Sequence, residues 1–331
     1  MNHPLSKMKI PFRQILVIFL AGLLATASCR RDSQKQEQRQ IDVATLRGPA
    51  GMSMVHMMDS LEKLDDKSLS FAIKNEPMQV RPLILREKAE FAVVPTNMAS
   101  ILYNKGVHYK LAAIPVWGTL YLFGDQQNIN NWQDLKGKKI HLMAKGMTPD
   151  VMFQYLLKAN GIDPKQEVVL DYSFPTHIEL ANAVASGKAR LAVISEPMVS
   201  MVIKNNKKVQ PILSLNEAWE KQTASQIPQT ALLVHEGFAQ SNPALVEAFL
   251  SAYRRSVDWI NENPLQAAER MTHYEIVNDS EVAAHSIPRC NIRFEKAENI
   301  QEEILNYLNT FYQMNPDIIG GQLPDENFFF K

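Results

Sequence analysis

The fold of this chain is decided by residues 135–197. They include Leu135-Lys-Gly-Lys-Lys-Ile-His-Leu-Met-Ala-Lys-Gly-Met-Thr-Pro-Asp150, then Tyr155-Leu-Leu-Lys-Ala-Asn-Gly-Ile-Asp-Pro164, and finally Ala185-Ser-Gly-Lys-Ala-Arg-Leu-Ala-Val-Ile-Ser-Glu-Pro197. Short apolar runs typical of buried strands alternate with longer helical patterns, and a turn or cap stands at nearly every junction. The stretch therefore predicts strand, helix, strand, helix, strand.

Local signals set the bounds of these elements. Thr148 is expected to cap a helix that has Pro149 at its first position and Gly161 just past its end. Thr176 and Glu179 have the spacing of a capping box, which opens a second helix that ends at Gly187. The strands expected around these helices are 139–143, 168–170, 191–194 and 209–213.

A similar run of elements comes earlier in the chain. Strands are expected at 41–46, 71–73, 91–94 and 111–114, with helices through 54–61, from near Pro77 to 87, and over 96–104. Strands that alternate with helices at this spacing predict a mostly parallel sheet covered on both faces. Two such runs of similar length predict two lobes.

The remainder of the chain supplies helices. A polar stretch at 214–228 is followed by an apolar strand at 231–234, a helix from near Pro243 and a last helix over 300–311. The apolar faces of these helices must pack against another element, and the predicted sheet of the first lobe otherwise has too few helices to cover it. We therefore expect crossings between lobes near 117–123 and 228–234, which make a hinge. The predicted lobes are 41–121 plus 229–331, and 122–228.

The N-terminus has the features of an export signal. Basic residues precede an apolar run at 15–27, too short to span a membrane comfortably, and Cys29 follows. We expect residues 1–28 to be a signal peptide cleaved before a lipidated Cys29; ordinary cleavage after Ala27 is the alternative. Residues 29–40 contain almost no apolar side chain and are expected to be a flexible tether. The expected location is the periplasm or cell surface.

Composition and motifs exclude several classes of function. The 331 residues are 46% apolar and 21% charged, with a net charge of zero, so a nucleic-acid partner is not indicated. The usual hydrolase, metalloprotease, P-loop, dinucleotide-binding and Cys-x-x-Cys motifs are missing, and the eight histidines include no pair four residues apart. We expect neither catalysis nor a cofactor or metal, and we expect a monomer in which Cys290 is a partly buried free thiol.

The chain resembles the NMT1/THI5-like substrate-binding proteins of ABC importers for nitrate, sulfonates, taurine and thiamine precursors. The motifs that carry the resemblance are Gly48-Pro-Ala-Gly51, Trp132-Gln-Asp-Leu-Lys-Gly-Lys-Lys139, Thr148-Pro-Asp150, Ala185-Ser-Gly187 and Ser195-Glu-Pro197. The resemblance implies an α/β fold, a two-lobe clamshell of the periplasmic-binding-protein type (type II) with two interlobe crossings. It also implies an ABC permease as partner. Met147 departs from the small hydroxyl residue that is common in the family.

In open α/β sheets, ligands bind beyond the carboxyl ends of the strands, where helices begin. This rule selects candidate ligand-binding residues from both lobes. They are Arg47, Gly48, Gly51, Thr96, Asn97, Met147, Thr148, Phe174, Thr176 and Glu196, with Trp117 near the first crossing. Each also has a structural interpretation: the glycines as a turn, the threonines as helix caps, the aromatic residues as core, and Arg47 as a solvated strand end.

The two charged candidates indicate different ligands. Glu196 is suited to an amine or ring N–H group, or else fixes the lobes, and Arg47 is suited to a carboxylate, sulfonate or phosphate. The ligand is therefore expected to be aminopyrimidine-like or sulfonate- or nitrate-like. A receptor-linked ligand sensor and a thiamine-pyrimidine synthase are the alternative functions. The synthase is disfavoured because the resemblance associates it with a cysteine-rich segment, which this chain lacks.

Overall fold

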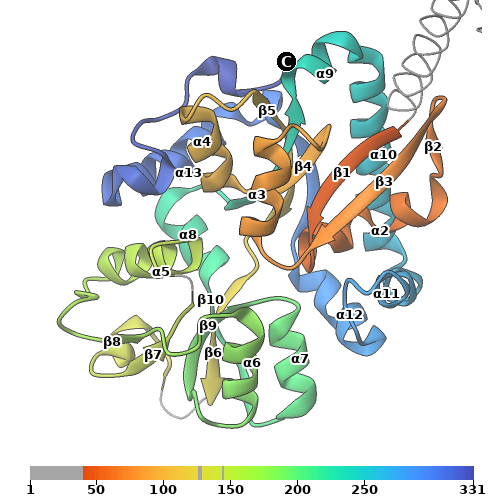
Figure 1. The fold of residues 1–331 in the computed structure, drawn as a ribbon. Helices are drawn as coiled ribbons and strands as arrows, with labels where there is room; N and C mark the ends of the chain where they lie inside the picture. The colour runs from red at the N-terminus through yellow and green to blue at the C-terminus, as the bar shows by residue number, and fades with distance from the viewer. Residues whose placement is uncertain (1–39, 126–128, 144) are drawn as a thin grey trace, which may run out of the picture.

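The structure is a computed structural model that describes residues 40–125, 129–143 and 145–331. Two β-sheets form separate lobes, one above the other in Figure 1. The seven-stranded sheet of the first lobe has the order β12-β5-β11-β4-β1-β3-β2. Its strands are β1 (Gln40–Leu46), β2 (Lys63–Leu64), β3 (Lys67–Lys74), β4 (Phe91–Pro95), β5 (Tyr109–Trp117), β11 (Pro228–His235) and β12 (Ile292–Lys296).

The five-stranded sheet of the second lobe has the order β10-β6-β9-β7-β8. Its strands are β6 (Leu120–Asp125), β7 (Lys139–His141), β8 (Val169–Asp171), β9 (Leu191–Ser195) and β10 (Val209–Ser214). All these strands lie between 120 and 214 along the chain, which supports lobe boundaries near those that the sequence predicts. We keep the boundaries themselves as a proposal.

Helices cover both faces of the first sheet. They are α2 (Pro49–Ser60), α3 (Pro77–Leu85), α4 (Thr96–Asn104), α9 (Glu236–Ser241), α10 (Pro243–Glu262), α11 (Pro264–His273), α12 (Ser280–Ser286) and α13 (Gln301–Met314). In Figure 1, α3 and α4 lie in front of the sheet and α2 and α10 behind it. The predicted apolar stripe of α10, which includes Phe249 and Tyr253, is fully buried. The late helices therefore cover the first lobe, as the sequence predicts.

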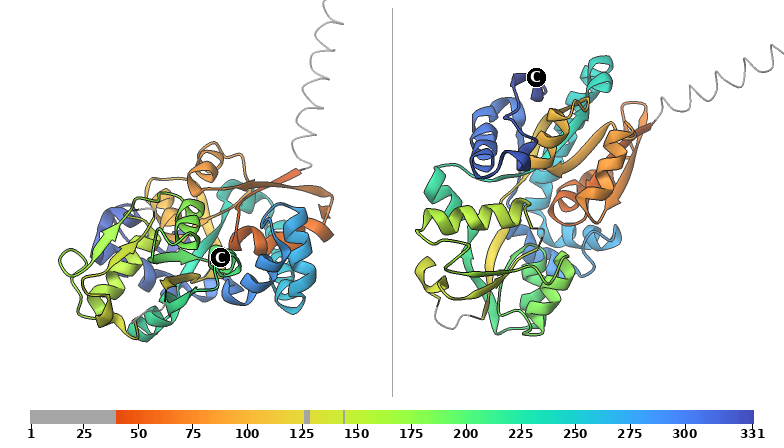
Figure 2. Two further views of the ribbon diagram at one scale, coloured as in Figure 1. Left: turned by 90° about the horizontal axis from the view of Figure 1, so that it is seen from below. Right: turned by 60° about the vertical axis from the view of Figure 1, so that its left-hand side comes forward.

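The second lobe and the crossing contain α5 (Thr148–Ala159), α6 (His177–Ala185), α7 (Met198–Asn205) and α8 (Leu215–Thr223). In the views of Figures 1 and 2, α5 and α8 lie where the two lobes meet. The polar stretch after β10 therefore contains a helix that the sequence did not predict. This stretch is part of the folded structure, because α8 packs on α5 and on β6.

The prediction of mostly parallel sheets is wrong for the strand pairings. In the described part of the first sheet, only β1–β3 and β1–β4 are parallel, while β11 pairs antiparallel with both β4 and β5. The reason is the return of the chain from the second lobe, since the returning strand is inserted between β4 and β5 in the opposite direction. In the second sheet, β6 likewise pairs antiparallel with β9 and with β10.

The two crossings lie side by side. The backbone N–H of Gly118, between β5 and β6, donates to the carbonyl of Ile227 just before β11, at 3.0 Å. The next N–H, that of Thr119, donates to the Gln229 side chain at 2.8 Å. Two adjacent, hydrogen-bonded crossings are the arrangement expected of a hinge between lobes. The clamshell fold is thus confirmed.

Candidate functional site

Four helices begin at the interface between the lobes. Two of them, α2 and α4, follow β1 and β4 of the first lobe, and the other two, α5 and α7, begin in the second lobe. None of the four N-cap residues makes a side-chain capping hydrogen bond. The first N–H groups of a helix lack partners within it and favour hydrogen-bond acceptors. The interface therefore collects helix N-termini from both lobes.

Direct contacts join these N-termini across the interface. A Cβ added to Gly48, the N-cap of α2, would lie 3.7 Å from Cδ of Pro197, the N-cap of α7. The Thr148 hydroxyl donates to Oδ1 of Asn97 over 3.1 Å, which joins α5 to α4. Of the predicted residues, Asn97 and Thr148 are thus in contact, and Gly48 lies near Pro197 of the opposite lobe. The lobes are in contact at these points.

The prediction that Thr148 caps α5 is wrong. Thr148 is the first helical residue, and the half-buried Met147 is the N-cap. The Thr148 hydroxyl bonds to the opposite lobe and not to its own helix. Thr96 is another predicted ligand-binding residue. It is fully buried, and its hydroxyl donates to the carbonyl of Pro228 at 2.5 Å, which connects α4 to the second crossing.

Glu196 forms a buried ion pair between the lobes. Its side chain has no exposed surface, and Oε1 accepts from Nε of Arg289, which belongs to the first lobe. Oε2 accepts from the backbone N–H and the hydroxyl of Ser200, at 3.0 and 2.9 Å. Burial raises the pKa of Glu196, and the Arg289 guanidinium opposes that rise. Both carboxylate oxygens have partners, which favours the interpretation that Glu196 fixes the lobes.

Ion pairs occur elsewhere on the same side of the interface. Lys204 of α7 pairs with Asp279 and Glu281 at the start of α12, at 2.7 and 2.8 Å. These two helices pack side by side in Figure 1. Ion pairs therefore connect α7 of the second lobe to α12 of the first lobe on this side of the interface.

The opposite side of the interface is aromatic. Tyr155 of α5, Trp219 of α8 and Tyr307 and Phe311 of α13 form a chain of ring contacts, with centroids 5.1 Å apart for Tyr155–Trp219 and 5.6 Å apart for Trp219–Tyr307. These residues belong to one apolar cluster that is continuous between the lobes. Sequence reasoning missed Trp219 and Tyr155 as interface residues. A tryptophan inside the otherwise polar stretch 214–228 was the available signal.

Two of these aromatic residues carry buried polar atoms. The indole Nε1 of Trp219 makes no hydrogen bond to any described residue, and the phenol oxygen of Tyr307 lies beside the Thr148 hydroxyl. The Thr148 hydroxyl lies near enough to Tyr307 to lower its pKa slightly, but the stronger effect of burial raises that pKa. Tyr307 therefore remains a protonated hydroxyl at neutral pH.

The other predicted residues have mainly structural contacts. Exposed Arg47 donates to Oδ1 of Asn75, at 2.8 Å, and to the carbonyl of Glu275. A Cβ on buried Gly51 would lie 2.8 Å from the Leu46 carbonyl oxygen, so the close approach of this backbone requires glycine. Whether either residue also binds ligand stays a prediction.

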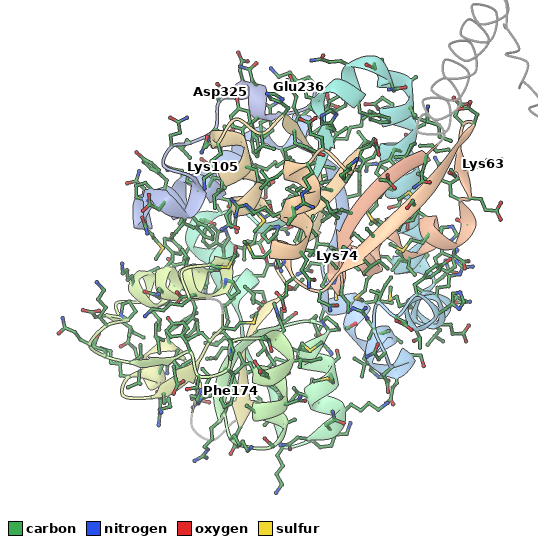
Figure 3. The ribbon with its side chains drawn as sticks, in the orientation of Figure 1. Lys63, Lys74, Lys105, Phe174, Glu236 and Asp325 are labelled. Atoms are coloured by element: carbon green, nitrogen blue, oxygen red, sulfur yellow. The ribbon has the colours of Figure 1, made fainter. Side chains whose placement is uncertain are left out.

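The predicted aromatic residues and the second capping threonine are placed as follows. The Trp117 ring is 1% exposed, its Nε1 donates to the Arg293 carbonyl at 2.9 Å, and the Arg293 guanidinium lies 4.2 Å from the ring centroid. Phe174 packs against the core of the second lobe (Figure 3). Thr176 forms the predicted capping box with Glu179, which is confirmed. Ligand contact by these three residues stays a prediction.

Cys290 is free and buried, and burial raises its pKa. Cys29 lies outside the described residues. Within the described ranges, no group of three or more His, Cys, Asp or Glu side chains is placed to hold a metal ion. The same ranges contain no helix that has both the length and the apolar character needed to cross a membrane.

Comparison with known proteins identifies the family. A family model described as "NMT1/THI5 like" matches residues 65–267, more than half of the chain. The chain belongs to the NMT1/THI5-like family. A curated relative of this NMT1/THI5-like chain, the putative binding protein YtlA of Bacillus subtilis, is 24% identical over 146 residues. That match spans 44% of this chain and 42% of the relative's length.

Solved structures share the fold of this NMT1/THI5-like protein. An ABC transporter protein from Parabacteroides distasonis has a TM-score of 0.78 and 26% identity, over 88% of this chain and 99% of that one. The periplasmic aliphatic sulphonate binding protein SsuA from Escherichia coli has a TM-score of 0.67 and 15% identity, over 86% and 96% of the two chains. The fold is that of the periplasmic binding proteins, as predicted.

Proposed function

We propose that this protein captures a small polar molecule between its two lobes and delivers it to an ABC importer in the membrane. The observation that carries the proposal is the interlobe interface itself. Helix N-termini from both lobes meet there, joined by the Asn97–Thr148 hydrogen bond and the Glu196–Arg289 ion pair. A ligand that adds further bonds to both lobes favours the closed state.

The comparisons support the same function. The chain belongs to the NMT1/THI5-like family, its curated relative is described as a putative binding protein, and the structures that share its fold are described as an ABC transporter and a periplasmic sulphonate binding protein. We propose binding without chemical conversion of the ligand. We also propose that the chain is exported and anchored through a lipid on Cys29, with the following polar residues as a tether to the folded lobes.

A thermal-shift screen of the full chain tests the proposal. Flat uncharged heterocycles, sulfonates, taurine, nitrate and amino acids are added separately, with sodium chloride at equal ionic strength as the control. A ligand at about a hundred times its dissociation constant adds about 2.7 kcal/mol to the stability of the folded state. We expect one chemical class to raise Tm by several degrees. If no compound changes Tm, the proposed capture of a small polar molecule loses its support.

A further inference from the structure

A cavity of about 250 Å³ lies beside the two crossings of the hinge. Trp117, at the end of β5, and Gln226, just before β11, line it from the crossings. The rest of the lining comes from the end of α10, from the turn that follows α12 and from β12. None of the four N-cap residues described above belongs to it. This hinge cavity is therefore separate from the proposed place of capture between the lobes.

Hydrogen bonds connect the lining of the hinge cavity to the backbone of both crossings. The Trp117 N–H donates to the Asn291 carbonyl at 3.0 Å, and Nδ2 of Asn291 donates to the Gly118 carbonyl at 2.5 Å. The Gly118 N–H in turn donates to the carbonyl of Ile227, the residue after Gln226. A molecule bound in this cavity would therefore touch the first crossing, the second crossing and the turn that joins them.

Arg293 supplies a positive charge to the hinge cavity. Its guanidinium lies 4.2 Å from the centroid of the Trp117 ring, a cation–π contact that holds it in place. Its Nε lies 3.7 Å from Oε1 of Glu295, whereas its two terminal nitrogens make no hydrogen bond to any residue that the structure describes. The planar guanidinium matches the geometry of a carboxylate. The hinge cavity therefore has a place for a carboxylate group.

Amide side chains supply hydrogen-bond acceptors to the same cavity. Nδ2 of Asn261 donates to the carbonyls of Val257 and Ile292, at 3.1 and 2.9 Å. Nδ2 of Asn291 is also bound to a backbone carbonyl. Because a carbonyl only accepts, both amide orientations are fixed and each Oδ1 remains an acceptor. The Gln226 side chain makes no hydrogen bond to a described residue and can accept as well. Several amide oxygens together suit an ammonium group.

Apolar side chains complete the lining. Ile287 and Ile292 are 3% and 4% exposed, and Pro288 lies next to Ile287 in the turn. Pockets for drug-sized ligands have volumes of about 300–1,000 Å³, so this cavity suits a smaller molecule. A place for a carboxylate, a place for an ammonium group and an apolar wall match the three parts of an apolar α-amino acid.

We propose that the hinge cavity is a second binding site, which takes an apolar α-amino acid. Arg293 binds the carboxylate, and amide oxygens of Gln226 and Asn261 accept from the ammonium group. Because residues of both crossings line the cavity, the bound amino acid favours one position of the hinge over others. Binding at this site does not require the proposed capture of a ligand between the lobes.

Calorimetry on the full chain tests the site with L-leucine, isocaproate and isoamylamine. Isocaproate has the leucine skeleton without the ammonium group, and isoamylamine has it without the carboxylate. Each compound is added to the wild type, Arg293→Gln, Gln226→Ala and Arg254→Gln. Arg254 is the matched control, because its guanidinium also lies over an aromatic ring, that of Phe294 at 5.1 Å, but does not line the cavity.

We expect leucine to bind the wild type, and isocaproate and isoamylamine to bind about tenfold more weakly, since each lacks one charged group. Arg293→Gln should weaken leucine binding about tenfold and Gln226→Ala about threefold, while Arg254→Gln leaves it unchanged. Without leucine, Gln226→Ala should keep the Tm of the wild type, because the lost amide has no partner in the described structure. Saturating leucine should change the radius of gyration of the wild type in X-ray scattering.

Four results would overturn the inference. If leucine binds Arg293→Gln and Gln226→Ala as tightly as the wild type, it binds elsewhere in the molecule. If either analogue binds as tightly as leucine, the amino-acid class is wrong. If leucine binds without any change in the radius of gyration, the site does not bias the hinge. If leucine does not bind the wild type at millimolar concentration, the site is absent, and the proposed function stands because it concerns other residues.

Discussion

At the scale of single residues, Glu196 shows how one contact changes an interpretation. From sequence alone its carboxylate is equally suited to binding an amine or to fixing the lobes. In the structure it is buried, and each of its oxygens already accepts hydrogen bonds from Arg289 or Ser200. A carboxylate with these partners is better explained as part of the contact between lobes than as a free ligand group.

Replacing Glu196 with Gln should weaken lobe closure. The substitution keeps the size of the side chain but leaves the Arg289 guanidinium without its counter-charge. We expect the free energy of unfolding to fall by about 1–3 kcal/mol, below the upper range for fully buried pairs because Arg289 is partly exposed. The dissociation constant for a ligand found in the thermal-shift screen should rise as well, which calorimetry measures.

Arg190→Gln is the control for this substitution. Arg190 pairs with Asp125 at 3.3 Å on the surface of the second lobe, and its side chain is 70% exposed. An exposed pair within one lobe should contribute less than about 1 kcal/mol and should not affect closure. Normal ligand affinity in the Glu196 variant would show that the ion pair does not assist closure.

Sequence distance explains which of these contacts were predictable. Thr176 and Glu179 lie three residues apart, so a local rule predicted their reciprocal bonds correctly. Glu196 and Arg289 lie 93 residues apart, and Thr148 lies 51 residues from Asn97. A local rule therefore assigned Thr148 to the cap of its own helix, whereas the tertiary fold directed its hydroxyl to the other lobe.

At the scale of elements, α6 is the helix whose start is fixed most clearly by local chemistry. The Thr176 hydroxyl accepts from the Glu179 N–H, and the Glu179 carboxylate accepts from the Thr176 N–H. Thr176→Ala should lower the stability of the fold by about 1 kcal/mol. In a chain of this size the expected fall in Tm is about 2–4 °C, measured by calorimetry.

Thr310→Ala is the control for the cap, because Thr310 lies inside α13 and its hydroxyl donates only to the Asn306 carbonyl of the same helix. Alanine favours a helix interior, so this variant should not lose stability. The α6 variant should also keep the ligand affinity of the wild type. Loss of binding in Thr176→Ala would indicate that Thr176 contacts the ligand, as the sequence had left open.

Most elements followed from periodicity, and two of the exceptions lie where the chain crosses between the lobes. The helices α2, α5 and α10 and the strands β1, β4 and β9 lie where the apolar patterns predict them. The missed elements include β6 and α8, which belong to the crossings between lobes, and also α7, α11, α12 and β12. A crossing contacts both lobes, so its apolar residues follow no single periodicity.

At the scale of the whole molecule, the close packing of Gly118 against α8 is expected to determine the relative orientation of the two lobes. A Cβ on this residue would lie 2.4 Å from Oδ1 of Asn216 and 2.9 Å from its Cβ, so α8 would have to move. Gly118→Ala should destabilise the fold by about 1–3 kcal/mol through overpacking. Because α8 packs on α5 and β6, its movement should disturb the lobe arrangement, and we expect weaker ligand binding and a changed radius of gyration in X-ray scattering.

Gly124→Ala is the matched control. Its added Cβ would lie 2.1 Å from the Arg190 carbonyl oxygen, a clash confined to the second lobe. This variant should lower Tm yet keep the ligand affinity and the ligand-induced compaction of the wild type. Equal behaviour of the two variants in binding would show that the Gly118 crossing does not set the lobe arrangement.

The sequence by itself determined the two α/β lobes, their hinge and the family, because periodicity, caps and turns act over a few residues. Only the tertiary structure decided which groups meet between the lobes. It brought Glu196 to Arg289, directed Thr148 to Asn97 and packed Trp219 against Tyr307. These contacts join segments far apart in the chain, and their existence depends on how two separately folded lobes pack against each other.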